Sequence, residues 1–137
     1  MAWTPEQKKA IELTGTNIIV SAGAGSGKTA VLTTRVLEKL KNGTHINELL
    51  ILTFTNAAAA EMKQRIKANI EKNNLLNELD LLDTSYITTF DSFALSIVKK
   101  YHYLLNISNK INITDSSLIA LQKRKILDDI FEKNYQN

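Results

Sequence analysis

The chain has 137 residues, of which 44% are hydrophobic and 23% are charged, a composition typical of one globular domain. The absence of cysteine excludes disulfides, cysteine-based zinc sites and thiol nucleophiles, and no apolar run reaches the roughly 18 residues that a membrane span needs. The net charge of +3 permits a nucleic-acid partner without demonstrating one, and we expect a soluble cytoplasmic protein without a membrane partner.

Helix and strand signals alternate at the start of the chain. Thr4 and Pro5 predict a helix start, with a hydroxyl cap and a proline in the first turn, and Gly15 predicts its end. The β-branched run at residues 17–21 predicts a buried strand. A helix is expected from Lys28 to about residue 42, because apolar residues recur there at helical spacing.

The rest of the chain continues the alternation. The expected elements are, in order, a buried strand over 49–54, a helix over 57–74, a shorter helix over 75–82, a strand over 86–90, a helix from Asp91 to about residue 103, an extended segment over 111–113 and an amphipathic helix from about residue 115. Strands that alternate with helices predict parallel βαβ units.

A glycine-rich segment lies between the first predicted strand and the next helix. It comprises Ala22, Gly23, Ala24, Gly25, Ser26, Gly27, Lys28 and Thr29. Glycines let backbone amides converge on an anion, and a helix start adds partial positive charge. Lys28 would reach the β- and γ-phosphates of a nucleotide, and the Thr29 hydroxyl would bind Mg²⁺. The segment therefore predicts a nucleoside triphosphate site, although the general pattern has glycine where this chain has Ala22.

Four segments together resemble the opening of UvrD/Rep-type superfamily 1 DNA helicases. They are residues 3–11, 22–29, 53–62 and 89–93. Their order and spacing agree over nearly the whole chain, and alanine is common in that family at the position of Ala22. Within the family, Trp3, residues 30–32 and residues 99–103 are most similar to the AddA (RexA) subunit of bacterial helicase–nuclease complexes.

The resemblance implies a role for Gln7 and for the segment after the second strand. Gln7 would read the edge of adenine, since an amide pairs with both a donor and an acceptor; the alternative is a solvated helix residue. Phe54, Thr55 and Asn56 match the family's first single-stranded DNA contact, in which an aromatic ring stacks on a base and polar groups hold phosphates. Without the resemblance, Phe54 would be a core residue and Asn56 a helix cap.

Thr89 and Phe90 match a further DNA-contact segment of the family. Relatives usually have histidine where this chain has Asp91, and a carboxylate repels phosphate, so Asp91 could instead cap the following helix. Ala57 stands where many relatives carry a lysine. The basic residues at positions 63, 65 and 67 are expected to form a solvated face.

The fold expected from the resemblance is α/β. Residues 1–108 would form an incomplete three-layer P-loop NTPase (RecA-like) domain with a parallel sheet, and residues 109–137 would start a helical insertion domain. The parent enzyme would use ATP and Mg²⁺ to move along single-stranded DNA and unwind duplexes in double-strand-break repair and recombination. Its partners would be DNA, the remaining helicase domains and a second helicase–nuclease subunit, and an exonuclease domain is implied by the resemblance alone.

The family places an Asp-Glu pair after an apolar strand to hold Mg²⁺ and orient water, and this chain has no such strand. Asp128 and Asp129 follow a helical pattern and are expected to be solvated. We therefore expect the chain to bind ATP without efficient turnover. One alternative is a non-catalytic nucleotide- or DNA-binding module. Another is a nucleotide kinase, which the small number of arginines disfavours because such enzymes need an arginine-rich lid.

Overall fold

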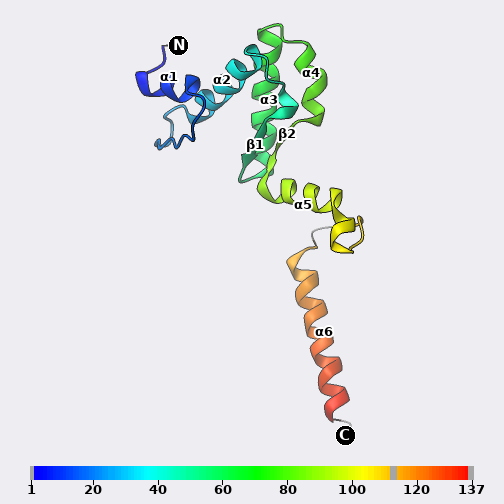
Figure 1. Ribbon diagram of the computed structural model, residues 1–137. Helices are drawn as coiled ribbons and strands as arrows, with labels where there is room; N and C mark the ends of the chain where they lie inside the picture. The colour runs from blue at the N-terminus through cyan, green and yellow to red at the C-terminus, as the bar shows by residue number, and fades with distance from the viewer. Residues whose placement is uncertain (1, 112–113, 136–137) are drawn as a thin grey trace. The chain divides into compact units, whose positions relative to one another are not determined.

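The structure, a computed structural model, describes residues 2–111 and 114–135 (Figure 1). The chain divides into two compact units, Met1–Ser96 and Ile97–Asn137, which are described here one at a time. The predicted domain boundary after residue 108 stays a prediction.

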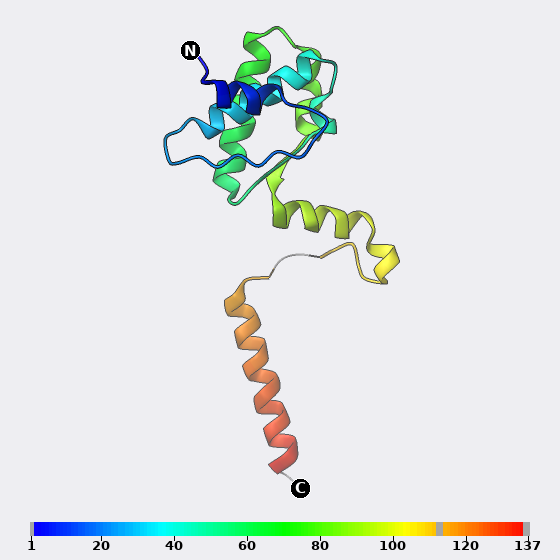
Figure 2. The same cartoon turned by 60° about the vertical axis from the view of Figure 1, so that its left-hand side comes forward.

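The first helix and the second pack against each other in the first unit (Figures 1 and 2). α1 (Pro5–Glu12) starts with a reciprocal cap: Thr4 Oγ1 accepts from the Gln7 amide at 3.2 Å, and Gln7 Oε1 accepts from the Thr4 amide at 3.0 Å. α2 (Lys28–Lys41) follows Gly27, whose φ of 84° suits only glycine without strain. Both predicted helices are confirmed.

The predicted strand over residues 17–21 is wrong. These residues lie in the loop that joins α1 to α2 (Figure 2), and the Ile19 side chain is 97% exposed. The described sheet contains only β1 and β2, which pair with each other. A β-branched run favours a strand only where it can pair and pack against neighbours, and this run has no partner strand among the described residues.

Two parallel strands form the sheet. β1 (Leu50–Thr53) pairs with β2 (Tyr86–Thr89) so that Leu50 lies opposite Tyr86 and Thr53 opposite Thr89. The crossover between them contains α3 (Asn56–Lys72) and α4 (Asn77–Leu81), which confirms a parallel βαβ unit. Ile51 is buried while Leu50 is half exposed, so β1 is buried on one face only, and the prediction of a fully buried strand is wrong.

The hydrophobic core lies where α3 packs against the sheet and against α2. Met62, Ile66 and Ile70, which recur every four residues along α3, are all buried. The other buried members of the core are Val36, Leu40, Ile46, Ile51, Leu82 and Ile87. Two short 3₁₀ turns, Ile46–Glu48 and Leu82–Thr84, contribute to this core. The unit is α/β, as predicted, while the three-layer arrangement stays a prediction.

α5 (Phe90–Lys100) begins one residue earlier than predicted and ends three residues earlier, before a 3₁₀ turn at His102–Leu105. The hydroxyl of Thr89, not the carboxylate of Asp91, accepts the hydrogen bond from the Ser92 amide, at 3.2 Å. The suggestion that Asp91 caps this helix is therefore wrong, since Asp91 already lies in its first turn.

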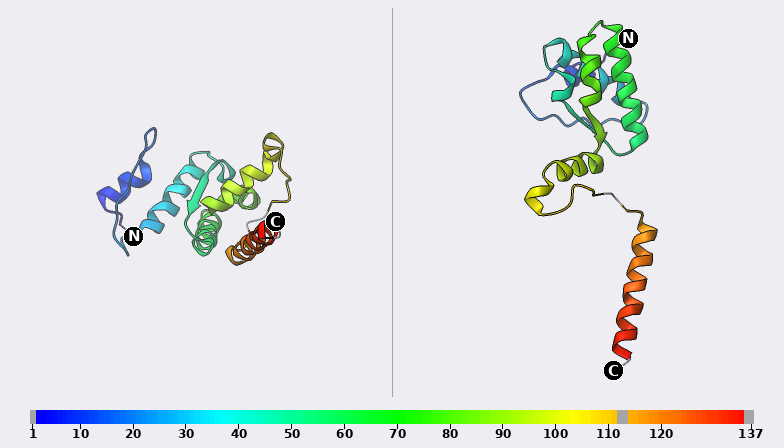
Figure 3. Two further views of the ribbon diagram at one scale, coloured as in Figure 1. Left: turned by 90° about the horizontal axis from the view of Figure 1, so that it is seen from below. Right: turned by 90° about the vertical axis from the view of Figure 1, so that its right-hand side faces the viewer.

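The second unit contains α6 (Ser116–Tyr135), which Figure 3 draws as one uninterrupted helix. No residue of α6 is buried, and Asp128 and Asp129 are exposed on it, as predicted. Of the predicted extended segment over 111–113, residues 112 and 113 lie outside the described residues, and Ile111 belongs to no strand. No helix among the described residues is long and apolar enough to cross a membrane.

Candidate functional site

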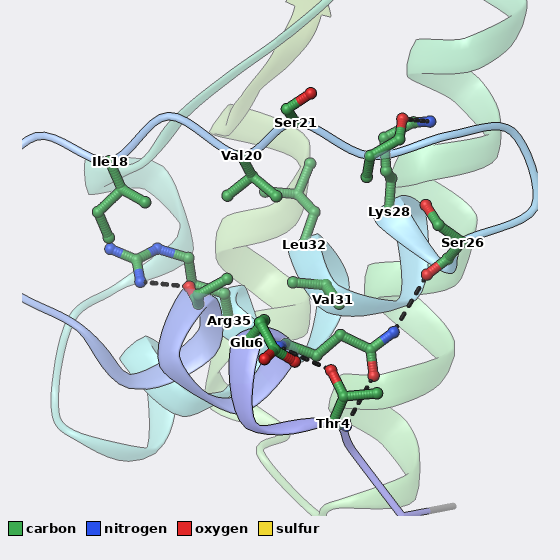
Figure 4. A pocket seen from close by; sticks show the side chains of 13 residues that line it. Thr4, Glu6, Ile18, Val20, Ser21, Ser26, Lys28, Val31, Leu32 and Arg35 are labelled. Carbon is green, nitrogen blue, oxygen red and sulfur yellow. Dashed lines mark hydrogen bonds between the residues drawn. The ribbon is translucent and has the colours of Figure 1, made fainter.

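A cavity of about 540 Å³ lies between α1, the loop after it and α2 (Figure 4). Its lining is mostly apolar, with a few polar and charged groups: Thr4, Glu6, Gln7, Ala10, Ile18, Val20, Ser21, Ala22, Ser26, Lys28, Val31, Leu32 and Arg35. In Figure 4, Leu32 projects from α2 toward the loop that carries Val20. This size and this mixture of groups are usual for small-molecule sites.

The glycine-rich loop holds the side chain of Lys28. The Lys28 ammonium donates to the carbonyl oxygens of Ala22 and Gly23, each at 2.7 Å. Ser26 Oγ also donates to the Gly23 carbonyl, at 2.8 Å. A polyphosphate that binds Lys28 must therefore replace two charge-assisted hydrogen bonds that the loop itself provides.

Gly25 and Gly27 give the loop its turn. Their φ angles are 75° and 84°, in the left-handed region where a Cβ atom is strained. Gly27 immediately precedes the first residue of α2, so its conformation sets the direction in which the amides at the helix start point. These two glycines are where the predicted phosphate loop depends on backbone freedom.

Gln7 connects α1 to the same loop. Its Nε2 donates to the Ser26 carbonyl at 3.1 Å, while its Oε1 is engaged in the cap with Thr4. The side chain is half-buried and lines the cavity. The alternative of a solvated helix residue is therefore wrong, and Gln7 lies beside the predicted phosphate loop.

Arg35 is a lining residue for which the sequence predicted no role at this site. Its Nη1 donates to the carbonyl oxygens of Ala10 and Ile11, at 2.8 Å and 3.1 Å, so α2 holds the C-terminal end of α1. The sequence does contain a signal for it. Arg35 follows Lys28 by seven residues, a spacing that puts both side chains on one face of a helix.

Thr29 lies in the first turn of α2 and is half-buried. Its hydroxyl is a hard oxygen donor, which is the kind of ligand that Mg²⁺ prefers, and Mg²⁺ usually completes its shell with phosphate oxygens and water. The residues present therefore fit the ion when it arrives with a nucleotide. Among the described residues, no group of three or more acidic, histidine or cysteine side chains could hold a metal by itself.

Glu6 carries the one carboxylate among the described residues that line the cavity. A hydrogen bond with its own backbone amide, and then one with the Thr4 hydroxyl, hold the pKa of Glu6 below its usual value. It is therefore ionised at neutral pH, in the first turn of α1, where the helix dipole favours negative charge.

The DNA-contact residues predicted from the resemblance come together at the carboxyl ends of the two strands. Thr53 and Thr89 are paired across the sheet, so the residues that follow them, Phe54 and Phe90, leave the same edge. The side chain of Phe54 is fully exposed and that of Phe90 is 69% exposed. The alternative that Phe54 belongs to the core is wrong.

The polar members of this group have structural partners. Thr55 Oγ1 accepts from the Ala58 amide at 3.1 Å and caps α3, so Thr55, and not Asn56, is the helix cap. Thr89 is buried, and its Oγ1 bonds to the Ser92 hydroxyl at 2.9 Å. Asn56 is exposed in the first turn of α3. Asn56 is thus the most accessible of the three polar side chains.

The basic residues on α3 have acidic partners. Their ion pairs are Lys63 with Asp83, Arg65 with Glu61, and Lys67 with Glu71. All six side chains are substantially exposed. These residues form a solvated, charge-balanced face, as predicted.

Comparison with known proteins adds a family and several relatives. Residues 3–137 match the family described as UvrD/REP helicase N-terminal domain. Proteins named as the A-type (AddA) component of an ATP-dependent helicase/nuclease are similar: that of Ligilactobacillus salivarius is 43% identical over 97% of this chain and 12% of its own length. That of Oceanobacillus iheyensis is 44% identical over 97% and 12%, and that of Heliobacterium modesticaldum is 42% identical over 98% and 10%. The chain thus spans 10% to 12% of these curated relatives.

Proposed function

Because the chain belongs to the UvrD/REP helicase N-terminal domain family, we propose that it is the ATP-binding part of an ATP-dependent DNA helicase. The family agrees with the resemblance found in the sequence, and the names of the relatives favour the AddA component of a helicase/nuclease. The observation that carries the proposal is that Lys28 from α2 and Gln7 from α1 bond to the same glycine-rich loop beside one cavity.

The loop would bind the triphosphate. Lys28 would exchange the carbonyl oxygens of Ala22 and Gly23 for β- and γ-phosphate oxygens, which carry full negative charge. The amides from Gly25 to Thr29 would converge on the phosphates at the positive end of the α2 dipole. The Thr29 hydroxyl would bind the Mg²⁺ that accompanies the nucleotide and neutralises the charge developing on the γ-phosphate.

Gln7 would read the base. Its amide lies at the cavity wall, between the α1 cap and the Ser26 carbonyl. An amide offers a donor and an acceptor side by side, as the edge of adenine does. The apolar lining contributed by Val31 and Leu32 suits the flat face of a purine ring.

Single-stranded DNA would bind at the carboxyl ends of the strands. Phe54 and Phe90 are exposed aromatic rings at one sheet edge, suited to stacking on bases. Asn56 would hold a phosphate, with Thr55 and Thr89 supporting the local backbone through their caps. ATP binding at one end of α2 and DNA binding at the sheet edge would be coupled through α3, which packs on α2 and on both strands.

The complete domain would be a three-layer RecA-like motor domain. The parallel pair of β1 and β2, with α3 and α4 in its crossover, would be one βαβ unit of that larger sheet. In the parent enzyme the motor would translocate on single-stranded DNA, unwind duplexes in double-strand-break repair and recombination, and act beside a second helicase–nuclease subunit. That larger role rests on the relatives' names and not on chemistry in these residues.

The test is ligand protection against thermal unfolding. Mg·ATP at about 100 times its Kd should stabilise the chain by about 2.7 kcal/mol, which raises the melting temperature by several degrees. Lys28→Ala should fold normally, since Lys28 is exposed, and should lose most of this protection. If Mg·ATP does not protect the well-folded wild-type chain, the proposed function is wrong.

A further inference from the structure

α1 is attached to the rest of the site at both of its ends. At its N-terminal end, Gln7 Nε2 donates to the Ser26 carbonyl at 3.1 Å. At its C-terminal end, Arg35 Nη1 donates to the carbonyl oxygens of Ala10 and Ile11 at 2.8 Å and 3.1 Å. Ile11, the buried residue of α1, lies at the Arg35 end. A helix of 8 residues is too short to be stable alone, so these attachments set its position.

The bonds of Arg35 are of a kind that orients a helix. The last carbonyl groups of a helix have no partner within it and carry the negative end of its dipole. A guanidinium that binds two of them satisfies both groups, adds charge assistance and fixes the rotation of the helix about its axis. In α1, that rotation decides where the Gln7 amide points.

α2 connects this anchor to the phosphate loop. Lys28 and Arg35 lie on the same face of α2, seven residues or about 10 Å apart along its axis, and both line the cavity. Lys28 bonds to the loop and Arg35 bonds to α1. One rigid helix therefore sets the distance between the group that would bind phosphates and the helix that would present Gln7.

We propose that Arg35 is a positioning residue that gives the site its preference for adenine, by holding α1 so that the Gln7 amide faces the base. This inference rests on the proposed function, in which the cavity binds ATP and Gln7 reads its base. It predicts that Arg35 controls which base is accepted and leaves the grip on the polyphosphate unchanged.

The experiment compares three ligands, ATP, GTP and inorganic tripolyphosphate, by calorimetric titration of the full chain with Mg²⁺. Arg35→Gln should weaken ATP binding about five- to tenfold, the value of one base-specific hydrogen bond. It should bring the ATP-to-GTP affinity ratio to that of Gln7→Ala and change tripolyphosphate affinity less than about twofold. Arg35→Lys should fall between these limits, since lysine donates without the planar fork.

Two further variants separate positioning from a general structural effect. Arg65→Gln removes an arginine that forms its ion pair with the exposed Glu61 on the same helix, and it should leave all three affinities unchanged. The double variant of Gln7→Ala and Arg35→Gln should bind ATP no more than about twofold more weakly than Gln7→Ala alone, because both changes act on one contact.

Two results would overturn the proposal: equal weakening of ATP and tripolyphosphate by Arg35→Gln, or an unchanged ATP-to-GTP ratio. Hydrogen exchange of the α1 amides in the ligand-free chain gives a readout that does not depend on nucleotide binding. Arg35→Gln should speed exchange there, and Arg65→Gln should not. If the wild-type chain binds neither ATP nor tripolyphosphate, the proposed function fails, and exchange alone then decides whether Arg35 holds α1; unchanged exchange refutes that anchoring.

Discussion

Phe54 and Phe90 are large apolar side chains that lie in water at the same edge of the sheet. A phenylalanine that is fully exposed contributes nothing to the core, so its presence at a strand end is better explained by a ligand than by packing. Exposed rings beside polar groups are a usual arrangement for stacking on unpaired bases.

Phe54→Ala should weaken binding of a single-stranded oligonucleotide by about 1–3 kcal/mol, the worth of one stacked base. It should not change the free energy of unfolding, because the side chain is 105% exposed. Fluorescence anisotropy at two salt concentrations measures the affinity, and a phosphate-binding site should also weaken as salt rises. Phe131→Ala, on α6, is the control and should have no effect; an equal loss from both variants would count against a site at the strand ends.

At the scale of single residues, the sequence predicts the groups that lie close together along the chain. The loop around Lys28 and the cap at Thr4 follow from spacing and turn chemistry alone. Arg35 and its carbonyl partners are about 25 residues apart, and no local pattern reports such a contact. The hydroxyls of Thr55 and Thr89 show a different limit, since a side chain that suits a phosphate suits a helix cap equally well.

Among the elements, Glu78 ties α4 to the turn that precedes β1. Glu78 is buried; its Oε2 accepts from the Ile46 amide at 2.8 Å, and its Oε1 pairs with His45 Nδ1 at 2.8 Å. The hydrogen bond with Glu78, then its negative charge, raises the pKa of His45 above the ordinary value of 6.5, with a smaller contribution from Glu48. Protonation of His45 therefore favours the folded chain.

The sign of the pH dependence follows from that shift. The stabilisation from His45 is fully present below pH 6.5 and is lost as the pH rises through the higher pKa of the folded state. Urea unfolding of the wild-type chain should thus show a fall in stability over that range which His45→Gln lacks. His102→Gln removes an imidazole bonded to the uncharged Ile107 carbonyl and should keep the fall. Parallel pH profiles for the wild type and His45→Gln would contradict this prediction.

The loop at residues 17–21 and strand β1 give a matched pair of isoleucines. Ile51→Ala should lower the free energy of unfolding by about 2–5 kcal/mol, because Ile51 is 7% exposed in the core. Ile19→Ala should change it by less than about 0.5 kcal/mol, because Ile19 is 97% exposed. Chemical denaturation measures both. A large loss from Ile19→Ala would mean that residues 17–21 are packed in solution.

The helices are predicted well from the sequence, and the strands less well. α3 carries its own start signal and apolar stripe, so its existence depends little on the rest of the chain. Residues 17–21 have as strong a strand signal as β1 and nevertheless stay irregular. A strand is stable only with a partner, and composition does not say whether the partner is present.

For the whole chain, we predict ATP binding without significant hydrolysis. Of the described residues that line the cavity, only Glu6 has a carboxylate, and it lies on α1 in the cap region. A catalytic arginine supplied from another domain is worth about 10³–10⁵ in rate. Steady-state phosphate release by the purified chain should therefore equal that of Lys28→Ala. Turnover that Lys28→Ala abolishes would show that the chain is catalytically complete.

The two-stranded sheet has a consequence for handling the protein. β1 and β2 use only their facing edges, so each has an outer row of amide and carbonyl groups with no strand beside it among the described residues. Leu50 and Tyr86 add apolar surface close to these rows. Such edges are templates for unwanted aggregation. Titrations are therefore best run dilute, and Leu50→Lys offers a route to samples concentrated enough for crystals.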